Sequence, residues 1–373
     1  MKTKKILLNL KNDFPDEVII RDIEREEDYV ALISQSAFSC LNIENCNLNT
    51  QSLSSQLSEL KEVFTCLGKE SLEHNEPLNF TFVYFSWRKC FYKILSKEFF
   101  YELLTWRNKN KINASEQFKI SNASIAIVGC SVGSSISKTL AKVGVTHLKI
   151  AESKYIKPSN SSRLSADSLC EYGEHKLSAL AKSLYEYNPY INLYLSFNGV
   201  EPSNLNEFVA GDNRLVDIVI DASDGIESKV ALRDICKSMH IPLISGWDER
   251  GVIEVERNDV AFCKFVRNYP LMDYNEDIYN SMLTKDFNMY VAKIMQCFPG
   301  GHTNLSSRSK ETLELISQGK LGGVPQLAWE ASLLASQVTK AVINIVLDKS
   351  CNTMGVYMMD LNEILGSQGK PFD

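Results

Sequence analysis

The segment from Ala123 to Arg163 places the strongest limit on what this chain can fold into. It opens with an uninterrupted apolar run, Ile125 to Val128, which lacks the polar alternation of a strand with one solvated face. Such a run is typical of a parallel strand buried on both faces. A small-residue turn follows, then a helical pattern from Ile136 to Val143 and a second strand, His147 to Ala151, ending at Glu152. The order of strand, turn, helix, strand and acid predicts a nucleotide-binding βαβ unit.

The turn and the acid give this unit its expected chemistry. Backbone N–H groups at the helix start would hold phosphate, and the Glu152 carboxylate would accept from ribose hydroxyls. The turn residues expected to bind nucleotide are Gly129, Ser131 and Gly133. Ser131 and Ser134 stand where the usual fingerprint has glycines, so a Rossmann-like unit that no longer binds nucleotide stays open. A nicotinamide dehydrogenase would share the first half of the unit.

Three further motifs make the interpretation more specific. They are KPSNSSR (Lys157 to Arg163), GEHK (Gly173 to Lys176) and DASD (Asp221 to Asp224), in this order. Together with the lead-in EQFKI at Glu116 to Ile120, they resemble the ThiF/MoeB/E1 superfamily over roughly residues 101–259. The resemblance implies a Rossmann-like, doubly wound α/β fold with a mostly parallel sheet, and ATP-dependent adenylation of a carboxylate. A dehydrogenase has no use for these three motifs.

The same resemblance assigns roles to single residues. Asn160 and Arg163 would contact the phosphates and ribose of ATP. Lys176 would face the triphosphate, which would offset the unfavourable placement of a lysine at a helix start. Asp224 would handle Mg²⁺, and Arg107 would reach into the ATP site of a partner subunit, which implies a homodimer. The simpler alternatives are a helix N-cap for Asp224 and solvated surface positions for Lys176 and Arg107.

The chain departs from the family pattern in two ways. Lys154 stands where the family usually has a second acid, and the first acid is Glu152 rather than Asp. Loss of one carboxylate affects the expected metal geometry more than nucleotide binding. None of the ten cysteines forms a CxxC pair, so no structural zinc is expected, although many family members carry one. ATP and Mg²⁺ are the expected cofactors.

Residues 1–95 lie outside the adenylation core, which is assigned to residues 96–373. Apolar runs predict strands at 5–10, 17–23 and 79–86, and helical spacing predicts helices at 28–38 and 52–67. A further helix with an aromatic face is predicted at 91–107. The small α+β module is similar to the winged-helix peptide-clamp domain of peptide-modifying family members, which implies a leader peptide bound as an added strand. The alternative is an N-terminal extension that buttresses a dimer.

Residues 259–322 match the region where the family places its crossover loop and substrate contacts. Asp248 and Arg250, just before it, are expected to face the substrate carboxylate. Cys263 and Cys297 fall inside it, and some relatives use a loop cysteine to take the acyl group as a thioester. No neighbouring histidine or basic cluster marks either thiol as activated. A helix at 327–347 is expected to cover one face of the sheet.

The charge and composition of the chain limit the kinds of partner that it is expected to bind. The formal net charge is −6 without a basic tract, which argues against nucleic acid. No apolar run is read as a bilayer span of ~20 residues, and the N-terminus does not fit a signal peptide. A cytoplasmic protein with reduced thiols and no membrane contact is therefore expected.

These observations lead to one principal hypothesis. The chain is expected to adenylate a carboxylate on a ribosomally made precursor peptide in peptide antibiotic (RiPP) biosynthesis, releasing pyrophosphate and AMP, with possible ring closure. One alternative is E1-like activation of the C-terminus of a ubiquitin-like or sulfur-carrier protein. A second alternative is a non-catalytic nucleotide sensor or scaffold.

Overall fold

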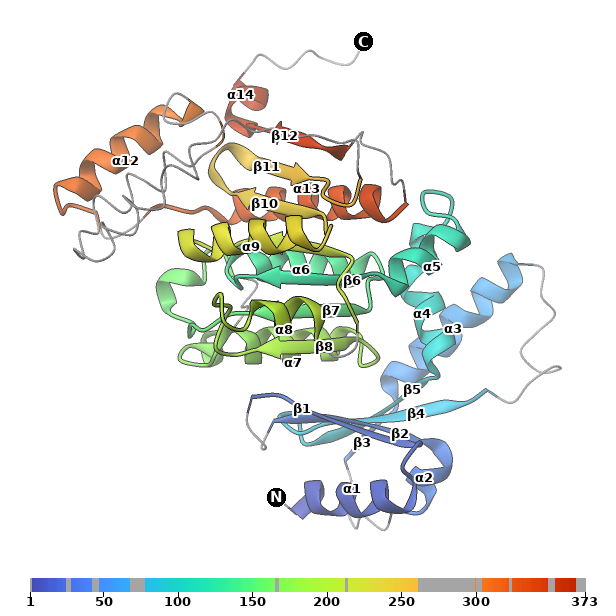
Figure 1. Cartoon of the computed structure of the whole chain (residues 1–373). Coiled ribbons are helices and arrows are strands. Elements are labelled where there is room, and N and C mark those ends of the chain that lie inside the picture. The colour runs from blue at the N-terminus through green and yellow to red at the C-terminus, as the bar shows by residue number, and fades with distance from the viewer. Residues whose placement is uncertain are drawn as a thin grey trace. The chain divides into compact units, whose positions relative to one another are not determined.

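Two β-sheets, one of five strands and one of seven, organise the chain in a computed structural model (Figure 1). The structure describes residues 2–24, 28–41, 47–67, 78–164, 168–211, 214–260, 299, 304–321, 324–347 and 353–366. Residue contacts divide the chain into two units. The first holds 1–121, 141–146 and 180–192, and the second holds 122–140, 147–179 and 193–373. The domain boundary after residue 95 stays a prediction.

The first unit contains the five-stranded sheet, in the order β1-β2-β4-β5-β3. Neighbouring strands are antiparallel except β3 and β5, which are parallel. Its elements are α1 (Lys2–Asp13), β1 (Val18–Asp22), β2 (Tyr29–Ser34), α2 (Gln35–Ser39), β3 (Leu48–Asn49), α3 (Gln51–Cys66), β4 (Phe80–Phe85), β5 (Cys90–Leu95), α4 (Lys97–Thr105), the 3-10 turn η1 (Trp106–Asn108) and α5 (Ala114–Asn122).

Three of the element predictions in this unit are wrong. Residues 5–10 lie in helix α1, where Leu7 and Leu10 are buried three residues apart, a helical spacing rather than a strand spacing. Residues 28–38 form β2 and then α2, because the Ser34 hydroxyl accepts from the Ala37 N–H and caps the helix. Residues 91–107 likewise divide into β5 and α4. In both cases a serine, Ser34 or Ser96, immediately precedes the short helix.

The second unit contains the seven-stranded sheet, in the order β12-β11-β10-β9-β6-β7-β8. β10, β9, β6 and β7 are mutually parallel, and β11 and β12 add antiparallel strands at one side. The mostly parallel α/β fold predicted from the sequence is confirmed. Its elements are β6 (Ser124–Val128), α6 (Val132–Lys142), β7 (His147–Ala151), η2 (Pro158–Asn160), η3 (Leu169–Glu171), α7 (Lys176–Tyr187), β8 (Asn192–Ser196), α8 (Leu205–Ala210), β9 (Ile218–Asp221), α9 (Ile226–Ser238), β10 (Leu243–Trp247), η4 (Glu249–Gly251), β11 (Val252–Glu256), α12 (Ser307–Ser317), α13 (Ala328–Leu347), β12 (Gly355–Met358) and α14 (Leu361–Gly366).

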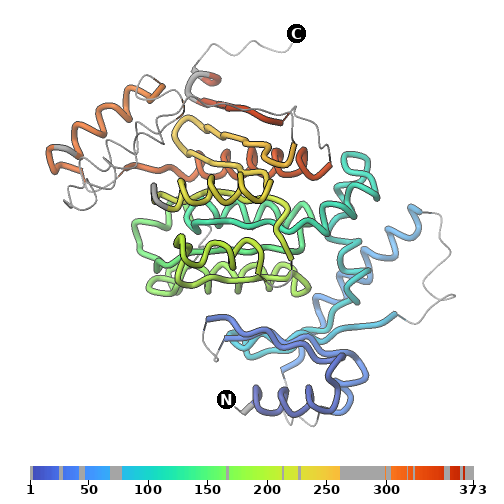
Figure 2. The backbone as a smooth tube through the Cα atoms, in the orientation of Figure 1, coloured from blue at the N-terminus to red at the C-terminus, as the bar shows by residue number. Residues whose placement is uncertain are grey.

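Helices cover both faces of this sheet. Ala126 and Val128 on β6 pack in one apolar cluster with residues of α8 and α9. Ile127, which points to the opposite face, lies under α6, where a Cβ on Gly133 would come within 3.2 Å of it. Burial on both faces explains why β6 reads as a continuous apolar run. The path from β6 through α6 to β7 can be followed in Figure 2.

Helix α13 packs on β10 and β11 and buries Leu334, Val338 and Val342, among others. Its predicted role as a cover for the sheet is confirmed. The sequence expectation that no apolar run reaches a bilayer span needs correction. Within the described ranges, α13 alone is long and apolar enough to cross a membrane by length and composition. A buried core helix of a soluble protein meets the same criterion.

Candidate nucleotide-binding site

The strand order of the second sheet defines where a ligand would bind. The chain runs outward from β6 to β7 and β8, then returns to the other side of β6 with β9 and β10. Ligands of doubly wound sheets bind at this reversal, outside the carboxyl ends of the strands. A cavity of about 250 Å³ lies there. It is lined by Val128, Gly129, Ser131, Ala151, Glu152, Ser153, Lys154, Lys176, Asn198, Gly199, Val200, Glu201, Ala222, Ser223, Asp224, Gly225 and Ser228.

The two glycines of the turn have different roles. Gly129 has φ +94°, and a Cβ there would lie 2.4 Å from the carbonyl oxygen of Ala222. Only glycine therefore allows the chain to leave β6 this close to the end of β9. Gly133 does not line the cavity, and its missing side chain instead lets α6 approach Ile127 on β6. Its predicted part in nucleotide binding is thus indirect, through the position of the helix.

A buried ion pair occupies one wall of the cavity. Lys176, the first residue of α7, is 5% exposed, and Glu152 at the end of β7 is 9% exposed. The Lys176 ammonium lies 3.4 Å from Glu152 Oε2 and donates to the Ser131 hydroxyl at 3.1 Å. The structure thus brings together three predicted site residues from three separate segments. A lysine this deeply buried is not the solvated surface residue considered as the alternative.

The Glu152 carboxylate is the most fully bonded group of the site. Oε1 accepts from the Ser153 and Lys154 N–H groups, and Oε2 accepts from the Cys130 N–H and from Lys176. Burial raises the pKa of Glu152, but the Lys176 charge and the three backbone donors outweigh burial, and the net shift is downward. Four donors use the four acceptor positions of a carboxylate. A ribose hydroxyl would have to displace one of them, so the ribose role of Glu152 stays a prediction.

Lys154, the residue that replaces the family's second acid, lines the same cavity. Its position supplies a second lysine beside Lys176, which favours an anionic ligand. Sequence reasoning treated Lys154 only as a loss of a carboxylate. It also missed Asn198 and Glu201, which line the cavity from the loop after β8. Since parallel strands present their following loops at one edge, the position after β8 was a signal that could have identified them.

The DASD motif separates into a structural acid and an exposed one. Asp221 is 0% exposed, pairs with Lys229 at 3.0 Å and accepts from the Ser223 N–H and hydroxyl. Asp224 is exposed and lines the cavity. Magnesium requires few protein ligands when phosphates supply the others. Asp224, as an exposed carboxylate in the cavity lining, fits a ligand for Mg²⁺ bound to phosphates. Among the described residues no group of three His, Cys, Asp or Glu could hold a metal ion.

A second acid leaves the neighbouring strand at the same offset as Asp224. Ser245 on β10 pairs with Asp221 on β9, and Asp248 and Asp224 each follow three residues later. Burial and then the Asp224 charge raise the pKa of Asp248 to about 6, while a Gln326 hydrogen bond and the Arg163 charge act in the opposite direction. Asp248 Oδ2 is buried and lacks a hydrogen-bond partner. The carboxyl edge therefore extends past β9, to Asp248 at the end of β10.

The remaining predicted residues lie outside the cavity lining. Asn160 Oδ1 accepts from the Lys157 N–H at 3.3 Å, and Arg163 donates to the Ser159 carbonyl at 3.2 Å. Arg163 is nevertheless near enough to Asp248 to lower its pKa. Arg107 is exposed on η1 in the first unit, and its role toward a partner subunit stays a prediction.

Arg250 has a structural role. Its guanidinium bonds to Asp360 at 2.6 Å and to the Asn304 carbonyl at 2.8 Å, contacts that join η4 to the C-terminal segment. These bonds argue against the expectation that Arg250 faces a substrate carboxylate. Cys263 and Cys297 lie outside the described residues, as does most of the predicted crossover segment 259–322.

The second unit is an α/β domain with a cavity at the carboxyl ends of its parallel strands, and part of the chain matches a known family. Residues 106–250 match the profile of the ThiF family. This segment contains the turn after β6, the Lys176–Glu152 pair, the DASD motif and Asp248. The chain therefore carries a ThiF family domain, and the superfamily resemblance stated from the motifs is confirmed.

Several known proteins are similar to the chain. An uncharacterized protein, MT1398, of Mycobacterium tuberculosis (strain CDC 1551 / Oshkosh) is 26% identical over 98% of this chain and 47% of its own length. The SAMP-activating enzyme E1 of Haloferax volcanii is 28% identical over 37% of this chain and 50% of its own length. The adenylyltransferase and sulfurtransferase MOCS3-1 of Zea mays is 30% identical over 35% of this chain and 27% of its own length. The chain spans half or less of each relative.

Solved structures give a weaker likeness. The selenomethionine form of PaaA aligns with a TM-score of 0.47 and 17% identity, covering 70% of this chain and 77% of that one. At this level of similarity the alignment carries no argument about function.

Proposed function

We propose that the chain binds Mg–ATP in the cavity at the carboxyl edge of the second sheet and adenylates a carboxylate. The observation that carries the proposal is the cluster of Lys176, Ser131, Lys154 and Asp224 around a glycine turn at the strand-order reversal. Cationic side chains, an open backbone turn and one exposed acid are the groups that a magnesium-bound polyphosphate requires. The ThiF family domain and the adenylyltransferase named among the relatives support the same chemistry.

In this proposal each side chain has a positional or electrostatic task. Lys176 and Lys154 neutralise phosphate charge, and Asp224 holds the cation against the phosphates. Arg163 faces the reacting centre from the end of η2, next to Asp248. A substrate carboxylate attacks the α-phosphorus of ATP and pyrophosphate leaves, so that the acyl group is carried as its adenylate. Preorganised charge of this kind stabilises the transition state without a dedicated general base.

The proposed substrate is a peptide or small protein. We infer a precursor peptide of natural-product biosynthesis, whose leader binds the first unit, in a cytoplasmic homodimer in which Arg107 completes the partner's site. The activating enzyme E1 named among the relatives favours a second candidate, the C-terminus of a carrier protein. The two differ in the acceptor, since the second predicts a thioester on Cys263 or Cys297. Thiol labelling after incubation with ATP and substrate distinguishes them.

ATP–pyrophosphate exchange with purified protein and candidate peptides tests the reaction. We expect peptide-dependent exchange that is lost in Asp224→Ala and retained in Asp234→Ala, a matched variant on α9 whose side chain is exposed and outside the cavity. Calorimetry of ATP binding is measured in parallel. Tight ATP binding without exchange for any peptide would favour a carrier-protein substrate or a nucleotide sensor, and no ATP binding would refute the assignment of the cavity.

A further inference from the structure

A second cavity lies in the first unit, away from the residues of the nucleotide site. Its volume is about 360 Å³, within the range of small-ligand pockets. All of its lining residues belong to the first unit, which includes residues 180–192 and therefore the C-terminal part of α7. They are Ser52, Val83, Phe85, Arg88, Tyr92, Ile94, Phe100, Glu186, Tyr187 and Pro189.

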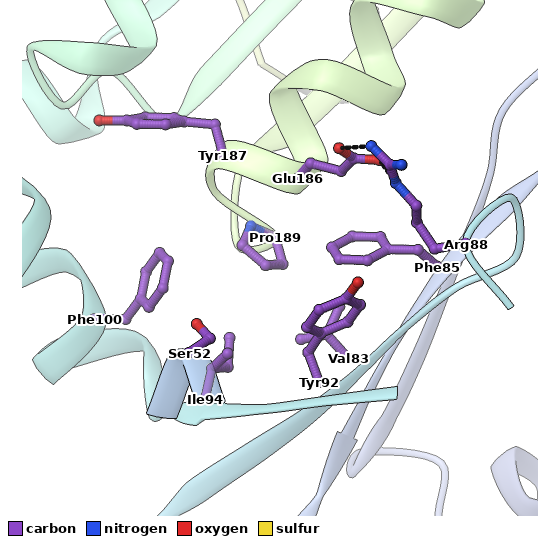
Figure 3. A pocket seen from close by; sticks show the side chains of 10 residues that line it. All are labelled: Ser52, Val83, Phe85, Arg88, Tyr92, Ile94, Phe100, Glu186, Tyr187 and Pro189. Carbon is purple, nitrogen blue, oxygen red and sulfur yellow. Dashed lines mark hydrogen bonds and ion pairs between the residues drawn. The ribbon is translucent and has the colours of Figure 1, made fainter. Parts of the chain in front are cut away.

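Seven of the ten side chains that line this cavity are aromatic or aliphatic, and the other three are Ser52, Arg88 and Glu186. Figure 3 shows the rings of Phe85 and Tyr92 on one side of the open space and that of Phe100 on the other, with Pro189 between them. The lining residues come from α3, β4, β5, α4, the end of α7 and the turns that follow β4 and α7. Phe85 packs on Tyr92 at 5.5 Å between ring centroids, and Phe100 packs on Tyr190 at 5.7 Å. Such a space favours a bulky apolar group over a hydrated one.

An ion pair between Arg88 and Glu186 lies at the rim of the cavity. Arg88 binds Glu186 through Nε at 2.8 Å and through Nη2 at 2.9 Å, and Glu186 also accepts from the Trp87 indole N–H. These bonds hold the guanidinium in place, while its side chain remains 57% exposed. The two bonds use only part of the five N–H donors of an arginine. A fixed donor group therefore lies beside an apolar space.

The Arg88–Glu186 ion pair determines which kind of ligand oxygen can accept a hydrogen bond from Arg88. Because Glu186 neutralises Arg88, a carboxylate gains little there, whereas a neutral carbonyl oxygen still gains a hydrogen bond. A bulky apolar side chain with a neutral carbonyl next to it describes a residue inside a peptide chain, not a free amino acid. We propose that this pocket binds a hydrophobic residue of a peptide, with the side chain between Phe85 and Phe100 and Arg88 donating to its backbone carbonyl.

The site goes beyond the proposed adenylation and does not depend on it, because binding can be measured without nucleotide. The probe is a tripeptide, N-acetyl-glycyl-(para-fluorophenylalanyl)-glycinamide, observed by fluorine NMR with the full chain. Para-fluorophenylalanine as the free amino acid and fluorobenzene serve as comparison probes. We expect line broadening and saturable binding for the tripeptide and much weaker binding for the other two.

Two matched variants on α3 locate the binding. Ser52 is exposed and lines the pocket, whereas Ser55 is exposed on the same helix and does not. We expect Ser52→Trp to fill the space and weaken tripeptide binding roughly tenfold or more, and Ser55→Trp to leave it unchanged. If Ser52→Trp fails to fold, as judged by circular dichroism, Ser52→Leu replaces it with a smaller filling group.

Three results would overturn the proposal. The first is no tripeptide binding to the wild-type chain at millimolar concentration, and the second is equal binding in the Ser52 and Ser55 variants. The third is binding of the free amino acid or of fluorobenzene as tight as that of the tripeptide, which would show that the backbone carbonyl is not recognised. Because ATP is absent from these experiments, their failure leaves the exchange assay unaffected.

Discussion

Replacing Asp248 with asparagine should stabilise the folded chain, and the gain should depend on pH. Folding raises the pKa of this carboxyl from 3.8 to about 6, first through burial and then through the Asp224 charge. The folded state therefore resists the ionisation that the unfolded state accepts, and the free energy of unfolding falls as pH rises from about 4 to 6. A pKa raised by roughly two lowers the free energy of unfolding by about 3 kcal/mol above pH 6, and by about half of that at pH 5. Asparagine keeps the shape and removes the ionisation.

Urea unfolding of the wild type and Asp248→Asn in EDTA, at pH 5 and pH 8, measures this gain. Asp234→Asn, which removes one exposed carboxylate from α9, controls for the change in net charge. We expect the midpoint of Asp248→Asn to exceed that of the wild type by more at pH 8 than at pH 5. A variant less stable than the wild type at pH 8, or a gain equal at both pH values, would refute the reasoning. A gain would also mark Asp248 as a residue retained despite its cost to stability.

Three further predictions concern the cavity and its supports. Gly129→Ala combines a positive φ with a clash against the Ala222 carbonyl, and urea unfolding should show a loss of at least about 2 kcal/mol. Lys229→Met leaves the fully buried Asp221 unpaired and should cost about 3 kcal/mol or more, partly recovered by adding Asp221→Asn, in the same measurement. Lys176→Met should weaken ATP binding roughly tenfold or more by calorimetry, because it removes the buried cation of the cavity wall. Unchanged ATP affinity would contradict its phosphate role.

The sequence predicted those helices and strands whose residue pattern follows from a single cause, such as burial on both faces. Residues 125–128 of β6 are all apolar because helices cover both faces of this strand, and the predicted helix start at Lys176 is confirmed by α7. Short elements were harder to predict, since apolar residues at 28–38 serve β2 and then α2. There the change of structure depends on the single hydroxyl of Ser34.

The candidate site was predictable only to the level of its strand ends. Chain order placed Glu152, Lys176 and Asp224 at one edge of the sheet, and the structure shows all three in the cavity lining. It could not show that Glu152 is already bonded by three backbone N–H groups, because those bonds depend on local turn geometry. Nor could it reveal that Arg250 pairs with Asp360, more than a hundred residues away.

Glu152 accepts hydrogen bonds from four donors, including Lys176, and this affects which anions the cavity can bind. The Lys176 ammonium is already neutralised by Glu152, so chloride or sulfate would gain little by approaching it. A chain of several phosphates carries enough charge to compete with one carboxylate and to engage Lys154 and the cation on Asp224 at the same time. The Lys176–Glu152 ion pair should therefore lower the affinity of the cavity for small anions more than its affinity for polyphosphates.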